Sequence, residues 1–185
     1  MKKFIILIFA FIFINHSNAQ LVINEYSAAN YDSYQDNYGD YRDWLEIYNS
    51  SAAPIDINGY YLSDKVINPT KWQVPSSFII PANDVGIVFC SGRDEVSGGF
   101  AHTNFKITQT KGNEVFILSD ASQVLLDSIT VRPNIKSHST GRETNGSSIW
   151  SVFDNATPTI ANTGAFERYS STPIFSIPSG YYSGS

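Results

Sequence analysis

Short apolar segments that alternate with turn residues place the strongest constraint on the fold of this chain. Beyond the N-terminal region, no window keeps apolar residues at the three- and four-residue spacing of an amphipathic helix. Turn residues, among them Gly59, Pro81 and Gly146, separate the segments. The sequence therefore predicts an all-β fold, an antiparallel sandwich or barrel. The strands are expected at 21–27, 44–49, 60–64, 71–74, 85–91, 114–120, 124–131 and 147–152.

Period-two alternation predicts which side chains face the core of this fold. In the segment 44–49, Leu45 and Ile47 share the face assigned to the core, while Trp44, Glu46 and Tyr48 share the other face. An Ile47→Asp change is therefore expected to unfold the domain, because it buries an unpaired charge. One core is expected to contain Leu45, Ile47, Tyr60, Leu62, Ile87, Phe89, Ile117 and Leu126.

The N-terminus has the pattern of a secretory signal peptide. Lys2 and Lys3 precede an apolar run from Phe4 to Ile14, and small residues precede the expected cleavage site after Ala19. The run is too short to span a bilayer as a helix, and no later segment is apolar enough, so we expect export without membrane insertion. The expected location is secreted or at the cell surface.

The charge of the mature chain argues against nucleic acid as a partner. Removal of Lys2 and Lys3 with the leader takes the formal charge from −5 to −7, which opposes binding to phosphate backbones. The sequence gives no indication of an oligomeric state.

Cys90 is the only cysteine, so the chain cannot form an internal disulfide. It lies in the apolar segment VGIVFCS and is interpreted as a small core side chain rather than a reactive thiol. Stability is therefore expected to come from packing.

The order of several segments resembles a known family, the bacterial lamin tail domains. The segments are VINEY (22–26), DWLEIYN (43–49), IDINGYYLSD (55–64), IIPANDVGIVFCSG (79–92), HTNFKIT (102–108), GNEVFILSD (112–120), HSTGRETNGSSIW (138–150) and TPTIANTG (157–164). The resemblance implies an immunoglobulin-like antiparallel β-sandwich over residues 20–166, after the signal peptide 1–19. One departure is Thr159, which follows Thr157-Pro158 where the family often has glycine.

Residues 167–185 differ in character from the rest of the chain. The segment STPIFSIPSGYYSGS is similar to the start of a chitobiase C-terminal or fibronectin-like module, a frequent neighbour of bacterial lamin tails. We expect a linker and the truncated start of a second β module.

No motif in the sequence indicates catalysis, so we expect neither enzymatic activity nor a cofactor. His102 and His138 lack the partner spacing that zinc requires, and no G-x-S-x-G segment or phosphate loop is present. Asn24, Glu25 and Asn49 are interpreted as residues that bind loop backbone. The Arg142 guanidinium is expected to lie on Trp150 across a hairpin centred on Asn145-Gly146.

A loop rich in aspartate and tyrosine, residues 31–43, precedes the strand at 44–49. Its carboxylates offer the hard oxygen ligands that calcium prefers, at Asp32, Asp36, Asp40 and Asp43, although their spacing differs from that of an EF-hand. Its aromatic rings would suit stacking on sugar faces, at Tyr31, Tyr34, Tyr38 and Tyr41. A solvated loop without a ligand is the third reading, under which Tyr34→Ala should leave the melting temperature nearly unchanged.

These patterns predict a non-catalytic extracellular module for adhesion, targeting or spacing in a larger protein. Its partner would be a glycan or a cell-surface protein. The alternative is an accessory domain of a secreted enzyme, such as a CotH-type kinase-like protein, with its catalytic part beyond residue 185.

Overall fold

A computed structural model describes residues 20–110 and 114–169. Within these residues the chain forms thirteen β-strands and no helix, which confirms the all-β prediction. The expected signal peptide (1–19) and most of the tail with the second β module (170–185) lie outside the described residues.

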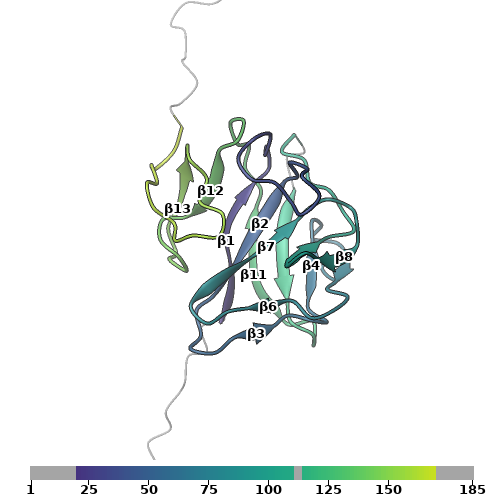
Figure 1. Cartoon of the computed structure of the whole chain (residues 1–185). Helices are drawn as coiled ribbons and strands as arrows, with labels where there is room; N and C mark the ends of the chain where they lie inside the picture. Colours follow the sequence, from purple (N-terminus) through teal and green to yellow (C-terminus); the bar gives the residue numbers. More distant parts are fainter. Residues whose placement is uncertain (1–19, 111–113, 170–185) are drawn as a thin grey trace, which may run out of the picture.

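The largest sheet has seven strands in the order β13-β12-β1-β2-β7-β9-β8 (Figure 1). All its neighbours pair antiparallel except β7 and β9, which run parallel. Its strands are β1 (Leu21–Ser27), β2 (Trp44–Asn49), β7 (Asp84–Phe89), β8 (Glu95–Ser97), β9 (Phe100–His102), β12 (Ser139–Arg142) and β13 (Trp150–Phe153).

A second sheet of four antiparallel strands has the order β11-β10-β4-β5. Its strands are β4 (Tyr61–Ser63), β5 (Trp72–Gln73), β10 (Val115–Ser119) and β11 (Leu125–Thr130). A small two-stranded sheet pairs β3 (Ile55–Asp56) with β6 (Ile79–Ile80).

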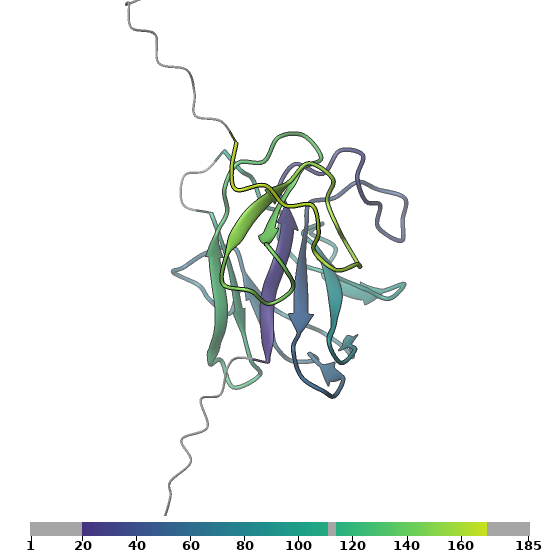
Figure 2. The same ribbon diagram turned by 90° about the vertical axis from the view of Figure 1, so that its left-hand side faces the viewer.

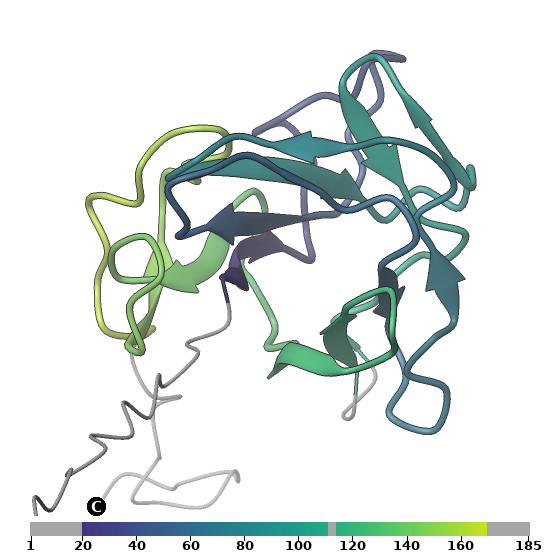
Figure 3. The ribbon, with the colours of Figure 1, turned by 90° about the horizontal axis from the view of Figure 1, so that it is seen from below.

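The two larger sheets enclose one main hydrophobic core. It combines Leu45 and Ile47 from β2 with Leu62 from β4 and Phe116 and Leu118 from β10, all of them fully buried. Figure 3 shows the layers from below, with β10 and β11 in green on the opposite side from β1 and β2 in purple and blue. This packing is the β-sandwich of immunoglobulin-like type that the sequence predicts. Cys90 is buried in the same core, as expected.

The predicted membership of that core is wrong for three residues. Ile117 of β10 lies on the outer face of the four-stranded sheet, where it lines a surface hollow. Ile87 and Phe89 of β7 lie on the opposite face of the seven-stranded sheet, where they form a second buried cluster with Trp44. The assignment failed because β7 is apolar on both faces, so alternation does not say which face meets the other sheet. Tyr60 and Leu126 are only partly buried against the main core.

All eight predicted strands are present, most of them a residue or two shorter or shifted at an end. Five more strands were not predicted: β3, β6, β8, β9 and β12. They are two to four residues long, and several are rich in Gly, Ser or charged residues, so they carry no alternation that a sequence pattern could reveal. In the part of the chain that the structure describes, no helix is long and apolar enough to cross a membrane.

Candidate functional site

The loop 31–43 is held at its base by Asn30. The Asn30 side chain donates to the carbonyls of Tyr34 (2.6 Å) and Arg42 (2.7 Å), and its carbonyl oxygen accepts from Ser33. These bonds join the two ends of the loop, as asparagine side chains often do where backbone groups lack a ladder partner. The loop is therefore a defined surface feature.

Two of the four loop aspartates are neutralised by arginine. Asp36 is buried, accepts the backbone N–H groups of Tyr38 and Asp40 (both 2.9 Å), and pairs with Arg93 at 3.0 Å. Asp40 pairs with Arg93 (2.6 Å) and Arg42 (2.9 Å), and the hydrogen bond from Arg93 lowers the pKa of its carboxyl. These ion pairs hold the loop against Arg93, which lies in the turn between β7 and β8.

The other two aspartates lie apart from this pair. Asp32 binds Ser137 and Lys136, whose ammonium is 3.3 Å away, and these contacts lower the pKa of Asp32. Asp43 accepts the N–H of Asn30 at 3.1 Å. Among residues 20–110 and 114–169, no group of three or more His, Cys, Asp and Glu side chains could hold a metal ion. The structure thus distributes the four residues proposed for calcium among separate partners.

The four loop tyrosines also fall into two groups, and the first group packs against other side chains of the protein. Tyr34 is half-buried and stacks on Phe89, with ring centroids 6.0 Å apart. It belongs to the second apolar cluster, so the expectation that Tyr34→Ala is harmless needs revision. Tyr38 lies under the Arg93 guanidinium (4.3 Å) and donates to Glu95 (2.7 Å).

Tyr31 and Tyr41 line one polar hollow of about 420 Å³ together with Asp43. Lys136 Nζ lies 5.6 Å from the centroid of the Tyr31 ring, and no cation–π contact is found at Tyr41 among the described residues. Their side chains are 64% and 42% exposed, which leaves much of each residue open to solvent. Asp43 is partly buried there. The remaining lining residues are Ala28, Ala29, Asn30, Ile107, Thr108, Gln109 and Thr110.

The electrostatics of this hollow are set by one carboxyl group. Burial raises the pKa of Asp43 to about 6, opposed by the hydrogen bond from Asn30, so the group is mostly ionised at neutral pH. None of the described lining residues is Lys or Arg. The hollow therefore offers two aromatic rings, threonine hydroxyls and one anion.

Sequence reasoning found Tyr31, Tyr41 and Asp43 but missed the opposite wall. Thr108 and Thr110 lie more than sixty residues along the chain, at the end of a segment that carries no residue of distinctive chemistry. Only the fold brings this wall beside the loop. No signal in the sequence would have identified it.

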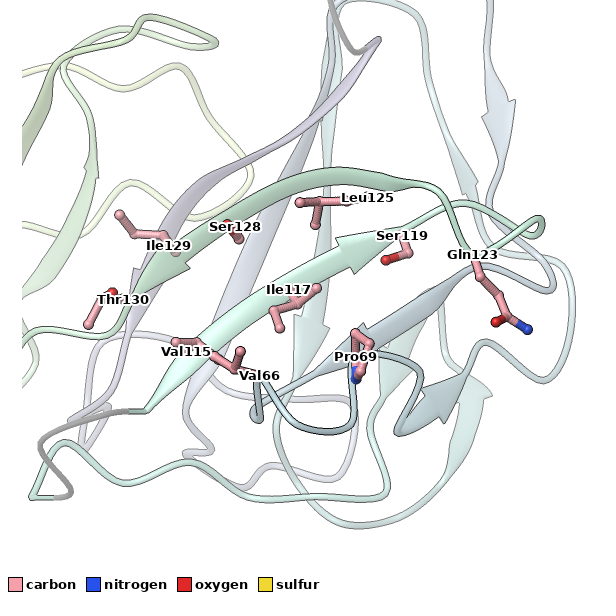
Figure 4. A pocket seen from close by; sticks show the side chains of 10 residues that line it. All are labelled: Val66, Pro69, Val115, Ile117, Ser119, Gln123, Leu125, Ser128, Ile129 and Thr130. Carbon is pink, nitrogen blue, oxygen red and sulfur yellow. The ribbon is translucent and has the colours of Figure 1, made fainter.

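A second hollow, of about 670 Å³, lies on the outer face of the four-stranded sheet (Figure 4). It is largely apolar, and none of its lining side chains titrates near neutral pH, so it could bind a partner by contact but has no group for acid–base chemistry. The lining residues are Val66, Pro69, Val115, Ile117, Ser119, Gln123, Leu125, Ser128, Ile129 and Thr130.

One cluster has the residue types of a catalytic triad. The Nδ1 of His102 is 3.1 Å from Ser91 Oγ, and its Nε2 is 2.8 Å from Asn37 Oδ1. Because Asn37 Oδ1 can only accept, the neutral imidazole donates to it from Nε2 and accepts the Ser91 hydroxyl at Nδ1, while Ser91 Oγ accepts the N–H of Arg93. Ser91 and His102 are buried, and burial lowers the pKa of His102. The arrangement attaches the loop to β9 and presents no exposed nucleophile.

Two glutamates lie side by side on the outer face of the seven-stranded sheet. Glu25 and Glu46 are cross-strand partners on β1 and β2, next to a β-bulge at Asn24 that turns Glu25 outward. Both are fully buried, and burial raises the pKa of each; with a smaller contribution from Glu25, the pKa of Glu46 reaches about 8. The prediction that Glu46 shares the outer face with Trp44 is thus confirmed, but that face is covered.

The C-terminal segment 157–162 covers this glutamate pair. Thr157 donates its N–H and hydroxyl to Glu25 (2.9 and 2.6 Å), and Thr159 donates its N–H to Glu46 (2.9 Å). Figure 2 shows the segment, in yellow-green, crossing in front of β2. On β12, a Cβ at Gly141 would lie 2.9 Å from Glu25 Cγ. Glycine at this position therefore leaves space for the Glu25 side chain. No substrate can reach the pair.

Asn24 binds loop backbone only through its carbonyl oxygen, which accepts the N–H of Gly146, because its amide group donates to side chains. The predictions for Asn49 and Arg142 are confirmed. Asn49 donates to the carbonyls of Ala53, Ile80 and Pro81, and thus binds loop backbone as expected. Arg142 lies over the Trp150 ring at 5.1 Å across the β12–β13 hairpin.

The model of the Lamin Tail Domain family matches residues 15–133. No curated protein matches the chain significantly.

Proposed function

The chain belongs to the lamin tail domain family, and from this premise we propose that it is a non-catalytic recognition module that binds glycans in the hollow between Tyr31 and Tyr41. The family gives the fold but no activity, since one fold serves many functions. The proposal therefore depends on the chemistry of the hollow.

The observation that carries the proposal is the pairing of exposed tyrosine rings with polar groups in one concave site. A pyranose ring has an apolar face that stacks on an aromatic ring, and hydroxyls at its rim that need hydrogen-bond partners. Tyr31 and Tyr41 supply the rings. Asp43 accepts from hydroxyls, while Thr108 and Thr110 both donate and accept.

Recognition without catalysis is favoured by the way the reactive groups are used. Hydrolysis of a glycoside generally needs two carboxyl groups on either side of the bond, and the described lining of the hollow contains one, Asp43. Another carboxyl pair, Glu25 and Glu46, is buried beneath the C-terminal segment.

The proposed setting is the cell exterior. The signal-peptide pattern of residues 1–19 supports export, and the negative charge favours a neutral or cationic partner over an anionic one. There the module would attach a larger protein to surface glycans, whether that protein is an adhesin or an enzyme.

A glycan panel tests the proposal. The purified chain is screened on immobilised oligosaccharides, and hits are titrated by calorimetry. Tyr31→Ala and Tyr41→Ala are each expected to weaken binding roughly fivefold, because loss of one stacked ring costs about 1 kcal/mol.

The matched control is Tyr38→Ala. This residue is 49% exposed in the same loop but lies outside the hollow, so its removal should leave affinity unchanged. The proposal fails if no glycan binds, or if Tyr41→Ala binds every hit as tightly as the unaltered chain.

A further inference from the structure

The carboxylate in the hollow has no cationic partner among the described residues. Asp43 accepts one hydrogen bond there, from the backbone of Asn30. The neighbouring cations are committed elsewhere: Arg42 pairs with Asp40, and Lys136 pairs with Asp32. Asp43 thus retains acceptor capacity for a donor supplied by a ligand.

The exposed rings beside this carboxylate are suited to a cation as well as to a sugar face. Lys136 Nζ already lies 5.6 Å from the centroid of the Tyr31 ring, so the place left for a ligand cation is beside Asp43 and Tyr41. Aromatic rings combined with a carboxylate are the recurrent means by which proteins hold ammonium groups. An acidic sugar would instead place its own carboxylate against Asp43 and be repelled.

We propose that the hollow selects amino sugars, that is, glycans in which a free protonated amine stands beside ring hydroxyls, such as non-acetylated glucosamine. The amine donates to the Asp43 carboxylate while a sugar face lies on Tyr41. This inference rests on the proposed glycan recognition and adds the ligand class to it.

The test compares three probes by calorimetry with the full chain at about pH 7, where Asp43 is mostly ionised. They are a glucosamine tetrasaccharide, its N-acetylated counterpart and a tetrasaccharide of glucose. We expect the glucosamine probe to bind about tenfold more tightly than the other two, because only it forms a charge-assisted hydrogen bond. Its affinity alone should fall as salt is raised.

Asp43→Asn is the decisive variant, because it keeps the acceptor for Asn30 and removes the charge. It should make the three affinities equal, because it weakens the binding of the glucosamine probe only. Asp154→Asn is the matched control, since that exposed aspartate does not line the hollow and pairs with no Lys or Arg among the described residues. It should retain the full preference.

The outcomes separate the two proposals. Equal binding of the three probes, or a preference that survives in Asp43→Asn, overturns the amino-sugar inference and leaves glycan recognition intact. Binding of none of the probes or panel glycans removes both. If Asp43→Asn does not fold, the salt dependence of the unaltered chain decides, and an affinity for the glucosamine probe that ignores salt overturns the inference.

Discussion

Replacing Glu46 by glutamine isolates the effect of burying a carboxyl group in this sandwich. Glu46 accepts hydrogen bonds from Asn24 Nδ2 (2.8 Å) and from the N–H of Thr159 (2.9 Å). Glutamine has nearly the same shape and keeps one carbonyl acceptor, but it cannot ionise. A difference between the two proteins that depends on pH therefore reports the charge.

The sign and size of the effect follow from the pKa of Glu46, which rises from an ordinary 4.5 to about 8 in the folded state. Below pH 4.5 Glu46 carries its proton in both the folded and the unfolded chain, so its ionisation does not lower the free energy of unfolding. As the pH rises from 4.5 to about 8, the unfolded chain loses the proton while the folded chain keeps it. The free energy of unfolding then falls by about 1.4 kcal/mol per pH unit, a total on the order of 5 kcal/mol.

Urea unfolding of both proteins at intervals between about pH 4 and pH 9 measures this difference. At the acidic end the glutamine variant should be less stable by about 1–3 kcal/mol, because its NH2 group replaces one of the two oxygens that accept from Asn24 and Thr159. Towards pH 8 it should become the more stable protein by several kcal/mol. Asp43, whose pKa burial also raises, titrates in both proteins and cancels. Glu25 interacts electrostatically with Glu46, so its altered titration adds a smaller part to the pH-dependent difference. A stability difference that does not change with pH would refute the reasoning.

Two further substitutions test the packing around the loop 31–43, and a third tests the space beside Glu25. Tyr34→Ala should lower the free energy of unfolding by about 2 kcal/mol, because its half-buried ring stacks on Phe89, and a melting temperature equal to that of Tyr31→Ala would contradict this. Arg93→Met should cost about 2 kcal/mol in urea unfolding, since it leaves the buried Asp36 unpaired; an unchanged midpoint would show that the ion pair is dispensable. Gly141→Ala should cost about 1–3 kcal/mol by crowding the Glu25 side chain, and thermal unfolding identical to the unaltered chain would contradict that close approach.

Calcium titration tests the aspartate-rich loop 31–43. Because Arg93 pairs with both Asp36 and Asp40, we expect no binding heat. Heat that disappears in Asp36→Asn would restore the calcium reading.

Local patterns in the sequence determined the strands, the turns and much of the main core. Alternation placed Leu45 and Ile47 correctly, because a strand whose two faces differ in polarity can be oriented from its own residues. The contact between Arg142 and Trp150 was predictable for a similar reason, since a hairpin brings together residues that are close in the chain.

Tertiary structure alone decided what covers the other face of the large sheet. Alternation separates the two faces of a strand but does not say whether the second face is exposed to solvent. Here Tyr34 from the loop covers Phe89. Thr159 covers Glu46, which lies 113 residues earlier in the chain. Tertiary structure also decided the hollow. Asp43 and Thr108 line the same site only because the strands between them fold back. Contacts of this kind depend on the sum of many weak packing terms across the whole sandwich, and a local pattern in the sequence carries no record of that sum.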